Sequence, residues 1–304
     1  MTTATKNPDF TNPEPQVGVI SGIFDAYSPG TSFRLILNKA LSLLCIAMAL
    51  VTFVPLFSII YLLVVKGWKH LGIATFTQLP PAPGMAGGGI GNAIIGTGIL
   101  VAIAMAMAAP LGIFAAIYIS EYSKNSKLAN AVRFTAKLLT GLPSIICGVF
   151  AYAMVVVTTG KFSALAGGVA LAVLALPTIL LTSEQALLNV PKTFREASLG
   201  LGGTPFQTIW KVILPEAFPA MMTGIMLAVA RAAGETAPVL FTSLFNSYWS
   251  KSVMEPTASL SVLIYNFSSV PYPNLIELAW TASLVLVIIV TITNVFSQLA
   301  FSRK

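Results

Sequence analysis

The sequence predicts an all-α membrane protein with six transmembrane helices. Of its 304 residues, 56% are hydrophobic and only 9% are charged, and the mean hydropathy is +0.85. A soluble domain carries roughly a quarter charged residues. The apolar residues form long continuous runs, which predict helices because the strands of a membrane barrel are short and alternate in polarity. The charged residues lie between these runs, so the net charge of +7 indicates membrane topology and not a nucleic-acid partner.

The chain is expected to divide into a tail and a membrane domain. Residues 1–33 are rich in Thr, Asn, Pro and Gly. They lack the basic start, short apolar core and small-residue cleavage site of a signal peptide. We expect this segment to be a polar cytoplasmic N-terminal tail. Residues 34–304 then form the transmembrane domain, which contains a polar loop at 190–215.

Six apolar runs are long enough to cross a bilayer. Between them lie a Pro- and Gly-rich loop at 66–89, a short charged loop at 121–133, and a polar loop at 246–274. Residues 184–214 are the only long polar and amphipathic stretch between spans. The predicted spans are 40–65, 90–120, 134–157, 162–181, 215–244 and 275–301.

The distribution of Lys and Arg predicts the orientation in the membrane. If the N-terminus is cytoplasmic, the outside segments hold only Lys66, Lys69, Lys161 and Lys251. The inside segments hold a larger set, namely Arg34, Lys39, Lys124, Lys127, Arg133, Lys137, Lys192, Arg195, Lys211, Arg303 and Lys304. We therefore expect a multi-pass protein with both termini in the cytoplasm and a cytoplasmic loop at 184–214.

The cytoplasmic loop is predicted to form two short helices. Thr193 and Glu196 have the spacing of a capping box, and so have Thr204 and Gln207, with Pro205 at the first helical position. Three glycines between the helices, Gly200, Gly202 and Gly203, permit a sharp turn.

The second of these helices has an apolar face. Phe206, Ile209, Trp210 and Ile213 recur at helical spacing. Two interpretations are open for this face. It packs on the membrane side of its own bundle, or it docks into a groove of a cytoplasmic partner.

Two charges interrupt the fifth apolar run, at Arg231 and Glu235. They are four residues apart, so on one helix they share a face and can touch. One interpretation is a self-satisfied ion pair that fixes helix packing. The other is an anion path at membrane depth, because an arginine fork donates two parallel hydrogen bonds to an oxyanion. Thr236 and Ser144 can add neutral donors to such a path, or they can bond to their own helix backbone.

The cytoplasmic loop resembles a motif of ABC importer permeases. Glu196-Ala197-Ser198, a three-residue gap, Gly202, a nine-residue gap and Val212-Ile213-Leu214-Pro215 fit the pattern EAA-x3-G-x9-I-x-L-P. Ser198 stands for the second alanine and Val212 for isoleucine. The resemblance implies a type I ABC importer permease fold, in which this helix-turn-helix inserts into a groove of the ATPase. It implies coupling roles for Glu196, Ala197, Gly202, Phe206 and Trp210.

Two further segments resemble the phosphate-uptake permeases. Residues 230–242 are similar to the signature of that family, and residues 142–150 to its LPSIV-x-G-x-F segment. The GETAP-x-LFT form is closer to the PstA type than to the companion PstC type. The resemblance implies a permease subunit of an ATP-driven inorganic phosphate importer. Such a subunit forms half of the translocation pathway and works by alternating access.

The same resemblance implies partners and a location. The partners are a second permease of the PstC type, two copies of an ATPase of the PstB type, an extracytoplasmic phosphate-binding protein of the PstS type, and membrane lipid. ATP and Mg belong to the ATPase, and no cofactor is expected on this chain. The loops at 66–89 and 245–274 are expected to meet the binding protein. The implied location is the bacterial plasma (inner) membrane.

An acidic residue beside an anion path needs an explanation. Glu235 either holds Arg231 in place and lowers its affinity, or accepts a hydrogen bond from a protonated phosphate oxygen. Sulfate lacks that proton at neutral pH, so the second hypothesis gives selectivity against sulfate. One arginine and one acid cancel, which favours a pathway shared with a second permease.

Enzymatic chemistry finds no support in the sequence. There is no G-x-x-x-x-G-K-[ST] segment, so the chain is not its own P-loop ATPase. The one histidine, His70, lies in a loop, and Cys45 and Cys147 lie in apolar runs, which leaves no catalytic or metal-binding set. The alternatives left open are the companion PstC-type permease, a permease for another oxyanion, a helical channel and an intramembrane enzyme.

Overall fold

The computed structural model describes residues 30–301, which are mostly helical and contain no strand. The expected N-terminal tail therefore lies mostly outside the described residues. The chain divides into two units at the boundary between Ile60 and Tyr61. The first unit holds most of α2 (Gly30–Gly67), a long and predominantly apolar helix that contains Pro55. The expected domain boundary at residues 33 and 34 stays a prediction.

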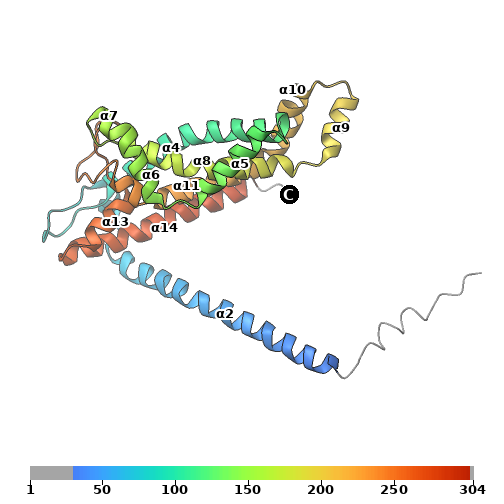
Figure 1. Cartoon of the computed structure of the whole chain (residues 1–304). Coiled ribbons are helices and arrows are strands. Elements are labelled where there is room, and N and C mark those ends of the chain that lie inside the picture. The colour runs from blue at the N-terminus through green and yellow to red at the C-terminus, as the bar shows by residue number, and fades with distance from the viewer. Residues whose placement is uncertain (1–29, 302–304) are drawn as a thin grey trace, which may run out of the picture. The chain divides into compact units, whose positions relative to one another are not determined.

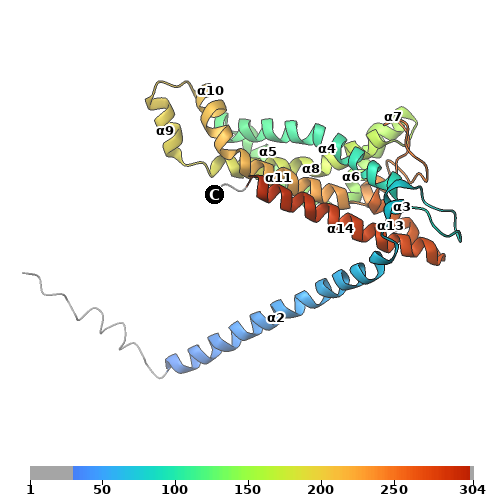
Figure 2. The same cartoon turned by 180° about the vertical axis from the view of Figure 1, so that it is seen from behind.

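The second unit is a helical bundle built around α8 (Ala164–Leu188). Its other long helices are α4 (Gly91–Ile117), α11 (Leu214–Gly234) and α14 (Pro273–Phe301). In its most apolar window α8 is 67% buried, against 28–39% for the spans that contain the other three, so α8 is the centre of the bundle. Figures 1 and 2 show these helices side by side from opposite directions.

Small residues allow α4 and α8 to pack closely. A Cβ at Gly112 of α4 would lie 2.9 Å from the side chain of Ile179, and a Cβ at Gly168 of α8 would lie 2.4 Å from Ile103. Backbones that approach this closely gain dispersion contacts, which drive helix association in a bilayer. Between them lies a core that includes Leu100, Ala104, Ala108, Leu171, Ala175 and Ile179.

The third predicted span is broken. Residues 134–157 were expected to form one helix, but α5 (Lys127–Thr140) and α6 (Ser144–Ala151) meet at 106°. The predicted continuity is wrong: Pro143 is the N-cap of α6, and a proline biases the preceding residue, Leu142, away from the helical region. The expected loop at 121–133 is also shorter than predicted, since Ser126 caps α5 by accepting a hydrogen bond from the Ala129 N–H at 3.0 Å. α6 continues through a π-helical segment at 152–156 into α7 (Val157–Thr159).

The fifth predicted span ends early. The run 215–244 was expected to be continuous, but α11 stops at Gly234 and a separate turn, α12 (Ala237–Leu240), follows. Pro238 has no N–H to donate to the carbonyl of Gly234, which favours a break there, although α4 and α8 continue through Pro110 and Pro177. Glu235 accordingly has an extended backbone, with φ −73° and ψ 129°. Arg231 and Glu235, which we call the charged motif, thus lie at a helix break.

Six membrane crossings remain consistent with the structure. Five described helices are long and apolar enough to span a bilayer, and the bent pair of α5 with α6–α7 makes a sixth if it counts as one span. The prediction of an all-α fold with six spans is confirmed in this sense. It was wrong about the continuity of the third and fifth spans.

The connections gather at two ends of the second unit. α9 (Lys192–Gly200) and α10 (Pro205–Thr208) form what we call the hairpin end. α3 (Ile73–Thr77), α7 and α13 (Leu260–Ser268) lie at the opposite end, the loop end, as both views show. There the Asn274 side chain donates to Met85 O at 2.8 Å and joins two segments far apart in sequence. The expected polar loop at 246–274 contains α13, whose Leu260 and Leu263 are buried.

Candidate functional site

The hairpin between α9 and α10 has a well-defined turn. Gly202 adopts φ +83°, a left-handed conformation that favours glycine. The capping box predicted at Thr204 is present: its Oγ1 accepts from Gln207 N at 3.2 Å, and Gln207 Oε1 accepts from Thr204 N at 3.0 Å. The box predicted at Thr193 is wrong, because α9 begins at Lys192 and Pro191 is its N-cap. Thr193 therefore lies inside the helix.

The hairpin is tied together by polar contacts. The hydroxyls of Ser198 and Thr208 are hydrogen-bonded at 2.8 Å, so the serine that replaces an alanine of the importer pattern joins α9 to α10. Gly203 packs against the same serine, since a Cβ there would lie 2.8 Å from Ser198 O. A shallow groove of about 450 Å³ runs between the two helices and is lined in part by Ala197 and Ser198.

The predicted apolar face of the hairpin splits into two stripes. Ile209 and Ile213 are buried against α4 and α8, whereas Phe206 and Trp210 are 61% and 39% exposed. The two exposed rings contact each other with centroids 5.9 Å apart. Packing on the bundle is thus confirmed for the two isoleucines, whereas docking of the aromatic pair into a partner stays a prediction. Of the remaining predicted coupling residues, Glu196, Ala197 and Gly202 are all exposed.

Arg195 anchors the hairpin to the bundle. Its guanidinium binds both oxygens of Glu121, at 2.6 and 3.2 Å, and donates to the carbonyls of Val190 and Leu187 at 2.8 and 3.0 Å. Glu121 follows α4 and has a side chain only 9% exposed. Because a bidentate pair fixes the relative orientation of its two side chains, this contact fixes α9 against the end of α4. From the sequence, Arg195 was interpreted only as a charge of the cytoplasmic loop, and its contact with Glu121 was not predicted.

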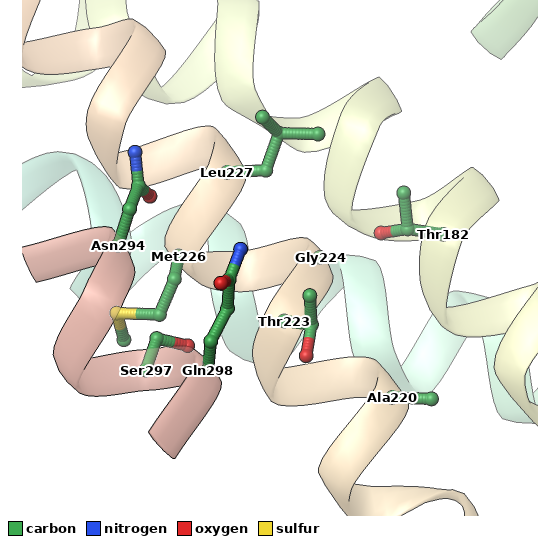
Figure 3. Close-up of a pocket in the computed structure, with 9 residues that line it drawn as sticks. All are labelled: Thr182, Ala220, Thr223, Gly224, Met226, Leu227, Asn294, Ser297 and Gln298. Atoms are coloured by element: carbon green, nitrogen blue, oxygen red, sulfur yellow. The ribbon is translucent and has the colours of Figure 1, made fainter. Parts of the chain in front are cut away.

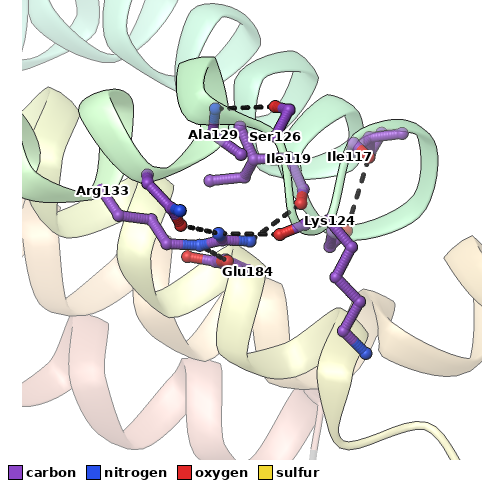
Figure 4. Close-up of polar contacts among 9 residues, drawn as sticks. Ile117, Ile119, Lys124, Ser126, Ala129, Arg133 and Glu184 are labelled. Atoms are coloured by element: carbon purple, nitrogen blue, oxygen red, sulfur yellow. Dashed lines mark hydrogen bonds and ion pairs between the residues drawn. The ribbon is translucent and has the colours of Figure 1, made fainter.

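A second buried ion pair, between Arg133 and Glu184, joins α5 to α8, and Figure 4 shows the contacts of Arg133. Arg133 Nε lies 2.5 Å from Glu184 Oε1, and its terminal nitrogens donate to Ile119 O, Lys124 O and Asn130 Oδ1 at 2.9, 3.0 and 3.2 Å. Glu184 is 6% exposed. It is the one acid in the sequence from 162 to 188, and an acid so placed in an apolar run requires a partner. That signal was present in the sequence, although it does not identify Arg133.

The charged motif forms an ion pair across the end of α11. Arg231 Nε lies 3.6 Å from Glu235 Oε1. The expectation that the two side chains meet agrees with this contact, but Glu235 lies beyond the helix and not on its face. The arginine side chain is 45% exposed and the glutamate 17%. The backbone oxygen of Glu235 accepts a hydrogen bond from Ser261 Oγ of α13 at 2.8 Å, which fixes the break.

α6 brings the other predicted residues toward this motif. A Cβ at Gly148 would lie 2.7 Å from the Cα of Pro238, so α6 and α12 are in close contact. Cys147 of α6 is buried within electrostatic range of Glu235 and Arg231. Ser144 and Thr236 are both half-buried, and neither hydroxyl bonds to its own helix backbone or to any other group among residues 30–301. Thr236 directly follows Glu235 in the chain, and Ser144 is the first residue of α6; neither is hydrogen-bonded to the ion pair.

The fold is that of an ABC importer permease. Residues 108–303 match the family described as binding-protein-dependent transport system inner membrane component. A crystal structure of a bacterial ABC transporter for alginate import has a chain with a TM-score of 0.56 at 16% identity, covering 89% of this chain and 99% of that one. A chain of the inward-facing MetNI methionine transporter has a TM-score of 0.54 at 22% identity, covering 69% of this chain and 92% of that one.

Sequence relatives define the family more narrowly. A PstA phosphate transport permease of Yersinia pestis is 40% identical over 86% of this chain and 89% of its own length. One from Xylella fastidiosa strain 9a5c is 40% identical over 89% and 94%, and a probable PstA from Methanocaldococcus jannaschii is 36% identical over 85% and 91%. The chain belongs to the PstA family of phosphate transport system permeases.

Family membership confirms the main predictions from sequence. The chain is a multi-pass membrane permease subunit of an ABC importer, and the companion-permease and channel alternatives are disfavoured. Such a subunit works with another permease subunit, an ATPase and a substrate-binding protein.

Proposed function

We propose that this chain carries inorganic phosphate through its half of the translocation pathway, at the helix break that holds Arg231 and Glu235. The observation that supports this most strongly is the Arg231 side chain, which is 45% exposed at the end of an apolar span. A charge at this position is costly in a membrane unless it serves a polar pathway. The unbonded hydroxyls of Ser144 and Thr236 lie on the adjoining elements and supply neutral donors for an oxyanion.

The site is incomplete within one chain. Arg231 and Glu235 cancel in charge, and a dianion needs a positive environment. The exposed side of Arg231 is therefore assigned to a second permease subunit of the PstC type, which supplies further donors. The same assembly contains two ATPase subunits of the PstB type, which bind ATP and Mg, and a PstS-type phosphate-binding protein. The chain lies in the bacterial inner membrane with both termini cytoplasmic.

The hairpin end is assigned to the ATPase. Phe206 and Trp210 form an exposed aromatic pair that suits insertion into an apolar groove. Glu196, Ala197 and Gly202 lie on the same exposed hairpin and set its shape and contacts. α10 runs through the π-helical segment 209–213 directly into α11 without a break. Movement of the hairpin is thereby passed to α11, which carries Arg231 in its last turn, and this is a route for alternating access.

Glu235 is assigned to selectivity. Its carboxylate accepts a hydrogen bond from the protonated oxygen of phosphate, which sulfate lacks at neutral pH. Glu235→Gln then raises sulfate uptake relative to phosphate uptake in vesicles that contain the complete importer. An unchanged ratio of the two uptake rates would remove this role from Glu235.

The proposed function is tested with the purified assembly. The four kinds of subunit are reconstituted in vesicles, and uptake of radiolabelled phosphate is measured with and without ATP and with and without the binding protein. We expect uptake only when both are present, together with stimulation of ATP hydrolysis by the loaded binding protein. Phosphate flux that needs neither ATP nor the ATPase would indicate a channel and contradict the proposal.

A further inference from the structure

A polar pocket opens between three membrane helices, away from the charged motif. Its volume is about 390 Å³, and it lies between α8, α11 and α14, as Figure 3 shows. None of its nine lining residues is charged. They are Thr182, Ala220, Thr223, Gly224, Met226, Leu227, Asn294, Ser297 and Gln298.

The polar side of the pocket comes mainly from α14. Asn294, Ser297 and Gln298 are spaced three and four residues apart, so they share one face of that helix. Figure 3 shows the polar ends of Ser297 and Gln298 between α14 and α11, with Thr223 across from them. The amides of Asn294 and Gln298 have no hydrogen-bond partner within residues 30–301. Three neutral polar side chains of α14 thus line one space.

Ser297 carries a buried, unsatisfied hydroxyl among the residues that line the pocket. The residue is only 2% exposed, yet its Oγ has no hydrogen-bond partner within the described part of the chain. A buried hydroxyl without a partner costs free energy, and native proteins rarely leave one so. Thr182 and Thr223 differ, since each donates to a carbonyl of its own helix, at 2.8 and 3.1 Å. The unsatisfied group is on the α14 side.

The pocket is aligned with the charged motif along α11. Thr223 and Leu227 line the pocket, and Arg231 follows at the same four-residue spacing, so the three residues lie along one stripe of the helix. At 1.5 Å per residue, Thr223 and Arg231 are about 12 Å apart along the axis. The pocket lies on the hairpin side of Arg231, because α11 begins at the hairpin end.

We infer that this pocket is a second phosphate-binding site on the hairpin side of Arg231, and we call it the second station. The inference rests on the proposed function and extends it. Neutral donors bind an oxyanion more weakly than an arginine does, which suits a station from which the substrate leaves. No carboxylate lines the pocket to repel it. Since one water occupies about 30 Å³, the pocket accommodates a tetrahedral oxyanion with part of its hydration shell.

The first experiment measures transport per ATP. Ser297→Ala and Asn294→Leu are introduced singly and together in the complete importer in vesicles. We expect phosphate uptake per ATP hydrolysed to fall by about threefold or more in the double variant, as for the loss of one or two neutral hydrogen bonds. Hydrolysis stimulated by the binding protein persists, because the hairpin and Arg231 are unchanged. Thr293→Val is the matched control: Thr293 is on the same helix, bonds to Ile289 O and does not line the pocket.

The outcomes of this experiment are separable. Unchanged uptake per ATP in an assembled double variant overturns the second station. If the wild-type importer itself takes up no phosphate, the proposed function fails instead. Should the double variant fail to assemble, the single Ser297→Ala variant, which removes only a hydroxyl, decides by the same ratio.

A second experiment identifies the source of the oxyanion, because a phospholipid headgroup carries the same oxygens. Asn294→Cys is made in a complete importer whose permease lacks Cys45 and Cys147, and its reaction with an anionic thiol reagent is timed in phospholipid-free detergent. We expect millimolar inorganic phosphate to slow the reaction, and chloride at equal ionic strength to leave it unchanged. Protection that requires added phospholipid and ignores phosphate assigns the pocket to a headgroup and overturns the inference, as does the absence of any protection.

Discussion

Removing the charge of Arg133 should destabilise the bundle more than any change of an exposed basic residue. In Arg133→Met the carboxylate of Glu184, with a side chain only 8% exposed, loses its ionic partner. Breaking a buried pair by removing one partner costs roughly 3–5 kcal/mol. Because the Arg133 side chain is 21% exposed and water reaches part of it, we expect the lower end, about 3 kcal/mol. At roughly 2–4 °C per kcal/mol, the melting temperature should fall by roughly 6–12 °C.

The assay is thermal unfolding of the purified chain in detergent, followed by intrinsic fluorescence. The double variant Arg133→Met with Glu184→Leu removes both charges and should recover most of the lost stability, since no buried charge is left alone. Lys137→Met is the matched control on the same helix, where the lysine is exposed. If Arg133→Met melts at the same temperature as Lys137→Met, the reasoning about this ion pair is refuted.

Three further changes test the packing and the hairpin. Gly96→Ala places a Cβ 1.9 Å from the backbone oxygen of Ala258 and should lower the stability of the fold by roughly 1–3 kcal/mol in the same melting assay. The control Gly98→Ala meets nothing within 4 Å and should leave the stability equal or slightly higher. Gly202→Ala forces a left-handed backbone on alanine, which costs about 1–2 kcal/mol of hairpin stability, and it should weaken retention of the ATPase in affinity purification. The control Gly200→Ala has open space around its Cβ and should retain the ATPase. Gly148→Ala pushes α6 from α12 and should reduce phosphate uptake in an importer that still assembles; wild-type uptake would show that this contact does not position the motif.

The apolar pattern predicted where the spans lie better than where they break. The runs were long enough to locate all the membrane segments, because bilayer thickness fixes the required length. Pro143 and Pro238 were visible, yet they were placed inside continuous spans. A proline in a membrane helix is compatible with either a kink or a stop, and neighbouring helices decide between the two. Here α6 packs against α12, so both breaks contribute to one neighbourhood.

Of the two capping boxes predicted from local spacing, the one at Thr204 was confirmed and the one at Thr193 was wrong, because α9 begins at Lys192. The Thr204 capping box depends on residues three apart and was found. The anchors made by Arg195 and Arg133 join residues 74 and 51 positions away, and no local pattern carries that information. The meeting of Arg231 and Glu235 was predicted from spacing, but a helix end between them changed its geometry.

The most direct test of the whole account is phosphate uptake by the complete importer carrying Arg231→Met. Uptake is measured in vesicles with ATP and binding protein, next to the wild type and to Lys161→Met, an exposed basic residue far from the motif in sequence. The account predicts a loss of about tenfold or more for Arg231→Met, since a hydrogen bond to a charged group contributes roughly 1.5–3 kcal/mol, with the ATPase still bound. Uptake by Arg231→Met at the rate of the wild type, in an assembled importer, would contradict it.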